Sequence, residues 1–177
     1  MNKILYFLII TSVLISPLQA KKPTLAKVES IHSNAEQRLS VNKYEFICKP
    51  YGIITIDELF LEAKISSTCR ISIDSFYRQN PRKRFFSESI LKRGQYYHVE
   101  FKKERCIIYA KGLNTLSELL LREGLAVKKT TFKDEEFDYS FQDAQIDAQE
   151  NNIGMHKNKI KYKCIAELFA LEQKERK

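Results

Sequence analysis

The order of apolar and polar residues along the chain predicts one domain of mixed α and β structure. Alternating apolar and polar side chains are typical of half-buried strands, and they predict strands over residues 39–48, 69–75, 95–103 and 105–110. Apolar residues that recur every three or four positions predict a short helix from residue 55 and further helices over residues 87–92, 113–124, 134–152 and 160–177. Residues 21–38 show little periodicity and are expected to form a leading arm or one weak strand.

Two of these helices start with a capping box, in which a Thr is followed three residues later by a Glu. Thr55 with Glu58 forms the first box and Thr115 with Glu118 the second. Gly124 suits the left-handed conformation that commonly ends a helix. The boundaries of these two helices are therefore the most sharply predicted.

The first 20 residues have the pattern of a cleaved secretory signal peptide. Lys3 supplies a positive charge, residues 4–15 form an apolar run, and Ala20 is a small residue suited to signal peptidase. The run of 12 residues is shorter than the ~20 that a spanning helix needs, although an uncleaved anchor is the alternative. Cleavage after Ala20 predicts a periplasmic or secreted protein, and no later apolar run is long enough to span a membrane.

The cysteine count supports export. All four cysteines, Cys48, Cys69, Cys106 and Cys164, follow the predicted cleavage site, and an even number in an oxidising compartment argues for two disulfides. Zinc is the weaker alternative, because there is no C-x-x-C pair and no His at ligand spacing from a Cys. Three connectivities are open, of which we favour Cys48 with Cys69 and Cys106 with Cys164.

About half of the chain resembles the staphylococcal-nuclease-like (thermonuclease) family. Residues 117–126, SELLLREGLA, are similar to the family's N-E-x-L-V-R-x-G-L-A helix end, and residues 144–155 are similar to its A-x-x-x-x-x-G-[IL]-W ending. The resemblance implies an α+β fold, a five-stranded OB-fold β-barrel packed against helices. It also implies an N-terminal arm and first strand at residues 21–47, a thermonuclease-like domain at 48–157 and an extra C-terminal helix at 158–177.

In that family a carboxylate-bound Ca²⁺, a glutamate that activates water and two arginines cut the phosphodiester of DNA or RNA. The resemblance implies that Asp74 binds the metal, that Arg70 is the first phosphate arginine and that Arg105 is the second. This chain departs from the pattern at two places. Phe76 and Tyr77 stand where the family has its Pro and general-base Glu, and Arg70 lies four rather than five residues before Asp74. A shift of one residue in a strand turns a side chain to the opposite face.

A basic and aromatic stretch follows these residues and contributes to the formal net charge of +8. Such a stretch is typical of proteins that follow a nucleic-acid backbone and stack bases on aromatic rings. The candidate backbone contacts are Arg78, Arg82, Lys83 and Arg84, and the candidate stacking residues are Tyr77, Phe85, Phe86, Tyr96 and Tyr97. The alternative is that the charges are solvated while the aromatic side chains pack the core.

Two functions remain open. We favour an exported, thermonuclease-like module with a degenerate active site, a monomer that binds nucleic acid or an envelope protein. The alternative is an active secreted nuclease that needs Ca²⁺. Loss of a general base typically reduces a rate by ~10²–10⁴-fold, which favours the catalytically impaired form.

Overall fold

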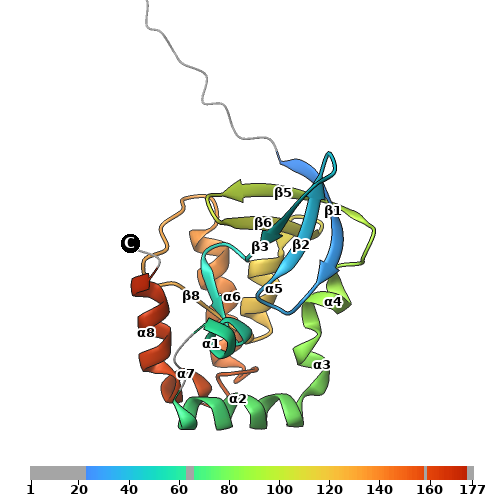
Figure 1. Cartoon of the computed structure of the whole chain (residues 1–177). Coiled ribbons are helices and arrows are strands. Elements are labelled where there is room, and N and C mark those ends of the chain that lie inside the picture. Colours follow the sequence, from blue (N-terminus) through green and yellow to red (C-terminus); the bar gives the residue numbers. More distant parts are fainter. Residues whose placement is uncertain (1–22, 63–65, 158, 175–177) are drawn as a thin grey trace, which may run out of the picture.

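The computed structural model describes residues 23–62, 66–157 and 159–174, and the predicted signal peptide lies outside them. These residues form a mixed α+β structure in which an antiparallel sheet lies at one end and helices pack beneath and beside it (Figure 1). One cluster of buried apolar side chains runs through the sheet and the helices, up to Leu168 and Leu171 near the C-terminus. The predicted α+β class is confirmed.

The six strands of the sheet lie in the order β3-β2-β1-β5-β6-β7, and all neighbours are antiparallel. They are β1 (Thr24–Ile31), β2 (Gln37–Val41), β3 (Tyr44–Cys48), β5 (Tyr96–Lys102), β6 (Arg105–Lys111) and β7 (Asn114–Thr115). A separate pair joins β4 (Ile53–Thr55) to β8 (Ala126–Lys128). The predicted hairpin of residues 95–110 is confirmed as β5 and β6. The described residues form no closed barrel, so the predicted OB barrel is not confirmed.

The N-terminal strands agree with the prediction in part, because the one weak strand that was the alternative to a leading arm does form. The weakly patterned residues 21–38 contain β1, which pairs with both β2 and β5 inside the sheet. The single strand predicted over residues 39–48 is the hairpin β2–β3. It reverses at Asn42 and Lys43, whose φ angles of 49° and 71° are those of a tight turn that matches the twist of the strands.

Eight helices are present in the described part of the chain. They are α1 (Ile56–Glu62), α2 (Ser67–Gln79), α3 (Pro81–Arg84), α4 (Phe86–Ile90), α5 (Leu116–Arg122), α6 (Asp138–Glu150), α7 (Ile160–Lys163) and α8 (Ile165–Lys174). Both threonines cap their helices, because the Glu58 and Glu118 N–H groups donate to the hydroxyls of Thr55 and Thr115 at 3.0 and 3.1 Å. The predicted C-terminal helix is broken at Cys164 into α7 and α8.

Gly124 is required where the ends of α5 and α6 cross. Its φ is +62°, and a Cβ atom there would collide with the backbone of Ile153. Met155 N–H donates to the Gly124 carbonyl at 2.9 Å, so the two backbones are in direct contact. Only a residue without a side chain allows this approach.

The strand predicted over residues 69–75 is wrong, because these residues belong to the helix α2. Its buried residues Cys69, Ile73 and Phe76 follow a spacing of four and three, and Ser66 caps its start by accepting from the Cys69 N–H at 3.3 Å. Ile71 and Ile73, which the alternation placed on one face, are 63% and 1% exposed. α2 runs along the base of the molecule, at the end opposite the sheet (Figure 1).

Two disulfides form, as predicted, but the favoured pairing is wrong. Cys48 pairs with Cys106, and Cys69 pairs with Cys164. The first pair joins the end of β3 to β6, where Tyr51 N–H donates to the Cys106 carbonyl and Cys106 N–H to the Lys49 carbonyl. The second ties α2 to the junction between α7 and α8. The topology joins residues 58 and 95 positions apart, and loops of that size imply a stabilisation of about 4 kcal/mol for each bridge.

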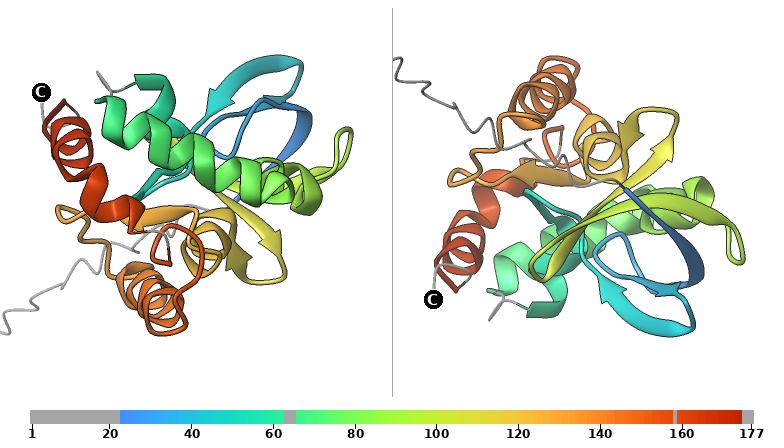
Figure 2. Two further views of the ribbon diagram at one scale, coloured as in Figure 1. Left: turned by 90° about the horizontal axis from the view of Figure 1, so that it is seen from below. Right: turned by 90° about the horizontal axis from the view of Figure 1, so that it is seen from above.

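Among the residues that the structure describes, no helix is both long and apolar enough to cross a membrane. The views from below and above (Figure 2) show α8 beside α1. The helix α6 lies on the side of the molecule away from α1. Among the described residues, no other element covers the lower surface, which α2 forms with α3 beyond it.

Candidate functional site

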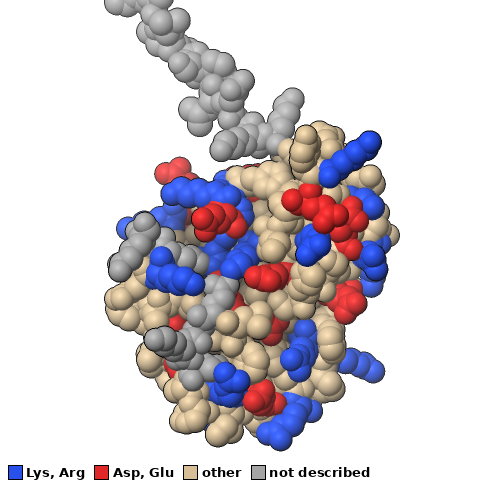
Figure 3. Space-filling view, in the orientation of Figure 1, with Lys and Arg blue, Asp and Glu red and all other residues tan. Residues whose placement is uncertain are grey.

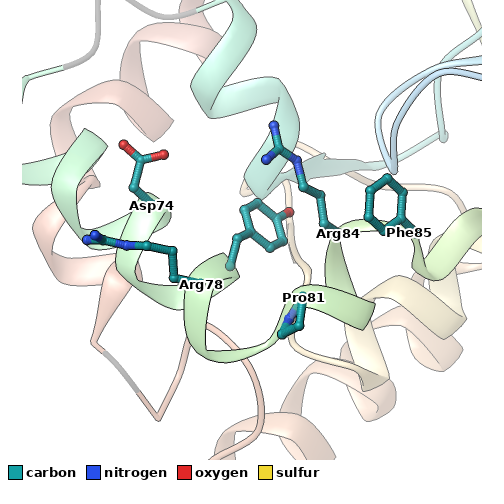
Figure 4. Close-up of a pocket in the computed structure, with 6 residues that line it drawn as sticks. Asp74, Arg78, Pro81, Arg84 and Phe85 are labelled. Carbon is teal, nitrogen blue, oxygen red and sulfur yellow. The ribbon is translucent and has the colours of Figure 1, made fainter.

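An open cavity of about 440 Å³ lies where α2 ends and α3 begins. It is lined by Asp74, Tyr77, Arg78, Pro81, Arg84 and Phe85. Asp74 and Arg78 extend from α2 on one side, and Arg84 and Phe85 lie on the other, with Pro81 between them (Figure 4).

The cavity exists because α2 stops at Asn80 and the chain turns. The Asn80 backbone leaves the helical region at φ −133° and ψ 62°, and its N–H and side-chain amide both donate to the Phe76 carbonyl. Pro81 is the first residue of α3, where its missing N–H costs nothing. The last turn of α2 and the short α3 therefore form two walls of the cavity.

Asn34, in the loop between β1 and β2, fastens this segment to the sheet. Its buried side-chain amide donates to the Lys83 carbonyl at 3.0 Å, and its Oδ1 accepts from the Ser87 N–H at 2.9 Å. Its backbone N–H donates to Oδ2 of Asp57 at 2.8 Å. One side chain thus links the loop, the end of α3 and the start of α4.

Tyr77 forms the inner wall of the cavity, and Asp57 holds its hydroxyl from behind. The Tyr77 hydroxyl donates to Oδ1 of Asp57 at 2.5 Å, and both residues are buried. Burial raises the pKa of Asp57, and the hydrogen bonds from Tyr77 and Asn34 oppose that rise. Burial and the neighbouring Asp57 raise the pKa of Tyr77 well above its ordinary value, so the phenol keeps its proton at neutral pH. The ring is therefore held in one position, with the Arg84 guanidinium 5.9 Å from its centre.

Three of the four predicted backbone-contacting residues are open to solvent. Arg78, Arg82 and Arg84 are exposed, and none of them has a carboxylate within 4.0 Å among the side chains that the structure describes. Lys83 is different, because it forms an ion pair with Glu123 and burial lowers its pKa. Lys and Arg side chains lie along the lower edge and lower right of the molecule in Figure 3, where Figure 1 places α2 and α3.

The aromatic residues of this stretch divide between the surface and the core. Phe85 and Tyr96 are 59% and 65% exposed. Phe86 and Tyr97 are partly buried against the core, and Tyr77 is buried. Phe85 is the exposed ring that lines the cavity, so it is the aromatic side chain placed to meet a ligand there.

The residues assigned to catalysis from the family resemblance do not come together. Arg70 and Asp74 lie one helical turn apart on α2, and the Arg70 guanidinium stacks over the Phe60 ring at 5.0 Å. No group of three or more Asp, Glu, His or Cys side chains in the described part of the chain is arranged to hold a metal ion. Asp74 shares its cavity with Arg78 and Arg84 instead. The residues around Asp74 therefore do not fit a Ca²⁺ ion.

Arg105 has a structural role in the interior of the protein. It is 9% exposed and forms an ion pair with the buried Glu58. Its guanidinium also donates to the carbonyl oxygens of Pro50 at 2.9 Å and Ile53 at 3.3 Å. These contacts hold the turn between β3 and β4 against β6, and they occupy the donors that a phosphate would need.

Two residues of the site were missed in the sequence, Asn34 and Asp57. Asn34 falls in a stretch that shows little periodicity, and Asp57 lies inside the first capping box, where an acidic residue is expected for the helix start alone. Their partners are 20 to 53 positions away, so no local pattern marks them.

Neither comparison with known proteins identifies a relative, since no protein-family model matches the chain and no curated protein matches it significantly.

We expect the change Arg105→Met to lower the free energy of unfolding by about 3–5 kcal/mol, because it leaves the Glu58 carboxylate buried without its partner. Urea unfolding of the oxidised protein measures this. The matched control is Arg78→Met, which removes an exposed guanidinium and should change stability by less than about 0.5 kcal/mol. Equal stability of the two variants would contradict a structural role for Arg105.

Proposed function

We propose that this chain is an exported, nuclease-like module that binds single-stranded nucleic acid without cleaving it. The observation that carries the proposal is the cavity between α2 and α3, where exposed guanidinium groups stand beside an exposed aromatic ring. The two disulfides are compatible with an oxidising compartment and so with export.

The order of the strands supports a fold of the OB type. In an OB barrel the first strand pairs with the second and the fourth, and the fifth strand returns alongside the third. Here β1 pairs with β2 and β5, and β5 pairs with β6. A parallel bridge joins Pro50 to Cys106 of β6, just beyond the end of β3, and the Cys48–Cys106 disulfide lies beside it. On this proposal β1, β2, β3, β5 and β6 are the five barrel strands.

The surface has the chemistry that a single strand requires. Over residues 76–94 the chain has six basic residues, Arg78, Arg82, Lys83, Arg84, Lys92 and Arg93, against one acidic residue, Glu88. Guanidinium groups bind phosphate oxygens through paired N–H donors. An exposed ring beside them offers a stacking surface to an unpaired base, which a duplex does not present.

The loop between β1 and β2 places this surface next to the sheet. In OB folds, nucleic acid is bound by a strand face together with the loops around it, including the loop between the first two strands. Asn34 belongs to that loop and is hydrogen-bonded to α3 and α4. The basic segment is therefore held on a rigid support, which reduces the conformational entropy lost on binding.

A cleaving enzyme is less well supported. The family reaction needs two arginines at the scissile phosphate, and Arg105 is committed to Glu58 in the interior. It also needs a carboxylate group for the metal and a general base, whereas Asp74 lies between guanidinium groups on a helix. We therefore propose binding as the function and treat cleavage as an outcome to be tested.

We expect Phe85→Ala to weaken binding of a short single-stranded oligonucleotide by about five-fold or more, since base stacking on an aromatic side chain contributes ~1–3 kcal/mol. Fluorescence anisotropy with a labelled oligonucleotide measures the affinity. Phe169→Ala is the matched control, because Phe169 is 60% exposed, almost as Phe85 is at 59%, but lies on α8. Loss of binding in the Phe169 variant alone would place the binding surface on α8 and contradict the proposal. A protein that binds no oligonucleotide would instead point to a protein partner.

We expect the purified, oxidised protein to leave single-stranded DNA and RNA intact, with Ca²⁺ or with EDTA, because the groups for hydrolysis are not assembled. A gel assay of oligonucleotide length over long incubation checks this, with Asp74→Ala alongside to identify contaminating nuclease. Turnover that requires both Ca²⁺ and Asp74 would establish the divergent nuclease and refute a role limited to binding.

A further inference from the structure

We infer that the cavity between α2 and α3 selects bases that present an amino group, and that Asp74 is the residue that reads it. The inference rests on the proposed function and adds a preference for cytosine over uracil or thymine. It follows from the presence of one carboxylate in a cavity whose other charged groups are guanidiniums.

Asp74 is not neutralised by its neighbours. Arg70 and Arg78 lie one turn before and after it on α2, the spacing at which ion pairs commonly form on helices. Nevertheless, within the described residues no Lys or Arg nitrogen lies within 4.0 Å of its oxygens, and the side chain is exposed. Both carboxylate oxygens are therefore available to accept hydrogen bonds from a ligand.

A carboxylate is unfavourable in a site that binds phosphate alone, because it repels the anion. It becomes favourable when the ligand also brings hydrogen-bond donors. A nucleotide does both: its phosphate suits the guanidinium groups of Arg78 and Arg84, and its base edge carries the donors. Phe85 and Asp74 lie on opposite sides of the same cavity (Figure 4), so a nucleotide that fills the cavity meets both the ring and the carboxylate.

The base edges differ in what they offer to a carboxylate. Cytosine presents the N4 amino group, which donates, and Asp and Glu side chains accept from it. Uracil and thymine present the O4 oxygen at the same position, and two acceptors facing one another repel. Cytosine and uracil have almost the same size, so a comparison of the two isolates this edge.

The test compares short oligodeoxycytidine and oligodeoxyuridine of equal length by fluorescence anisotropy, at one salt concentration and at a pH where cytosine is unprotonated. We expect the unmodified protein to bind the cytidine strand about ten-fold more tightly, a ratio within the range of one good base-edge contact. In Asp74→Asn the ratio should fall close to one, because an amide both donates and accepts, so that the uridine strand gains a donor facing its O4 oxygen. Asp74→Ala should also lose the preference, since it removes the acceptor.

Glu88→Gln is the matched control. Glu88 is exposed on α4 and does not line the cavity, so this change removes the same charge and should raise both affinities while keeping the ratio. Equal binding of both strands by the unmodified protein, or a preference that survives in Asp74→Asn, would overturn the inference and leave the proposed function standing. Absence of binding to either strand would overturn the proposed function itself.

Discussion

The hydrogen bonds of one buried asparagine hold the candidate site together. Asn34 reaches from the loop between β1 and β2 to the end of α3, the start of α4 and Asp57. Asp57 in turn accepts from Tyr77, the inner wall of the cavity. Without these bonds the short α3, which has only four residues, would have little to keep it in place, because a helix of that length is not stable alone. The position of the exposed arginines relative to α2 therefore depends on polar contacts with the sheet.

The arginines of the chain show how the same side chain takes opposite roles. Arg105 is enclosed with Glu58 and stabilises the turn after β3, whereas Arg78 and Arg84 remain open beside an aromatic ring. Breaking a buried pair is costly, while an exposed guanidinium is free to exchange water for a ligand's oxygen atoms. Arg105 therefore contributes to stability, whereas Arg78 and Arg84 form the open basic surface on which the proposed function depends.

Features encoded by neighbouring residues were predictable. The capping boxes at Thr55 and Thr115, the β5–β6 hairpin and the cluster of basic residues all depend on spacings of a few positions. The helix α2 was mistaken for a strand because Ile71 and Ile73 alternate with polar residues, although Cys69, Ile73 and Phe76 also carry the helical spacing. The disulfide pairing and the contacts of Asn34 could not be predicted, since they join residues 23 to 95 positions apart and depend on the completed topology.

On the proposed function, nucleic acid binds at the end of α2 and along α3. An NMR titration of the isotope-labelled, oxidised protein with a short single-stranded oligonucleotide locates the binding surface, because each backbone amide reports on its own surroundings. We expect the largest amide shift changes within residues 74–88, together with Asn34, and small changes along β2 and β3. Changes concentrated on the strands or on α8, or no changes at all, would contradict the claim.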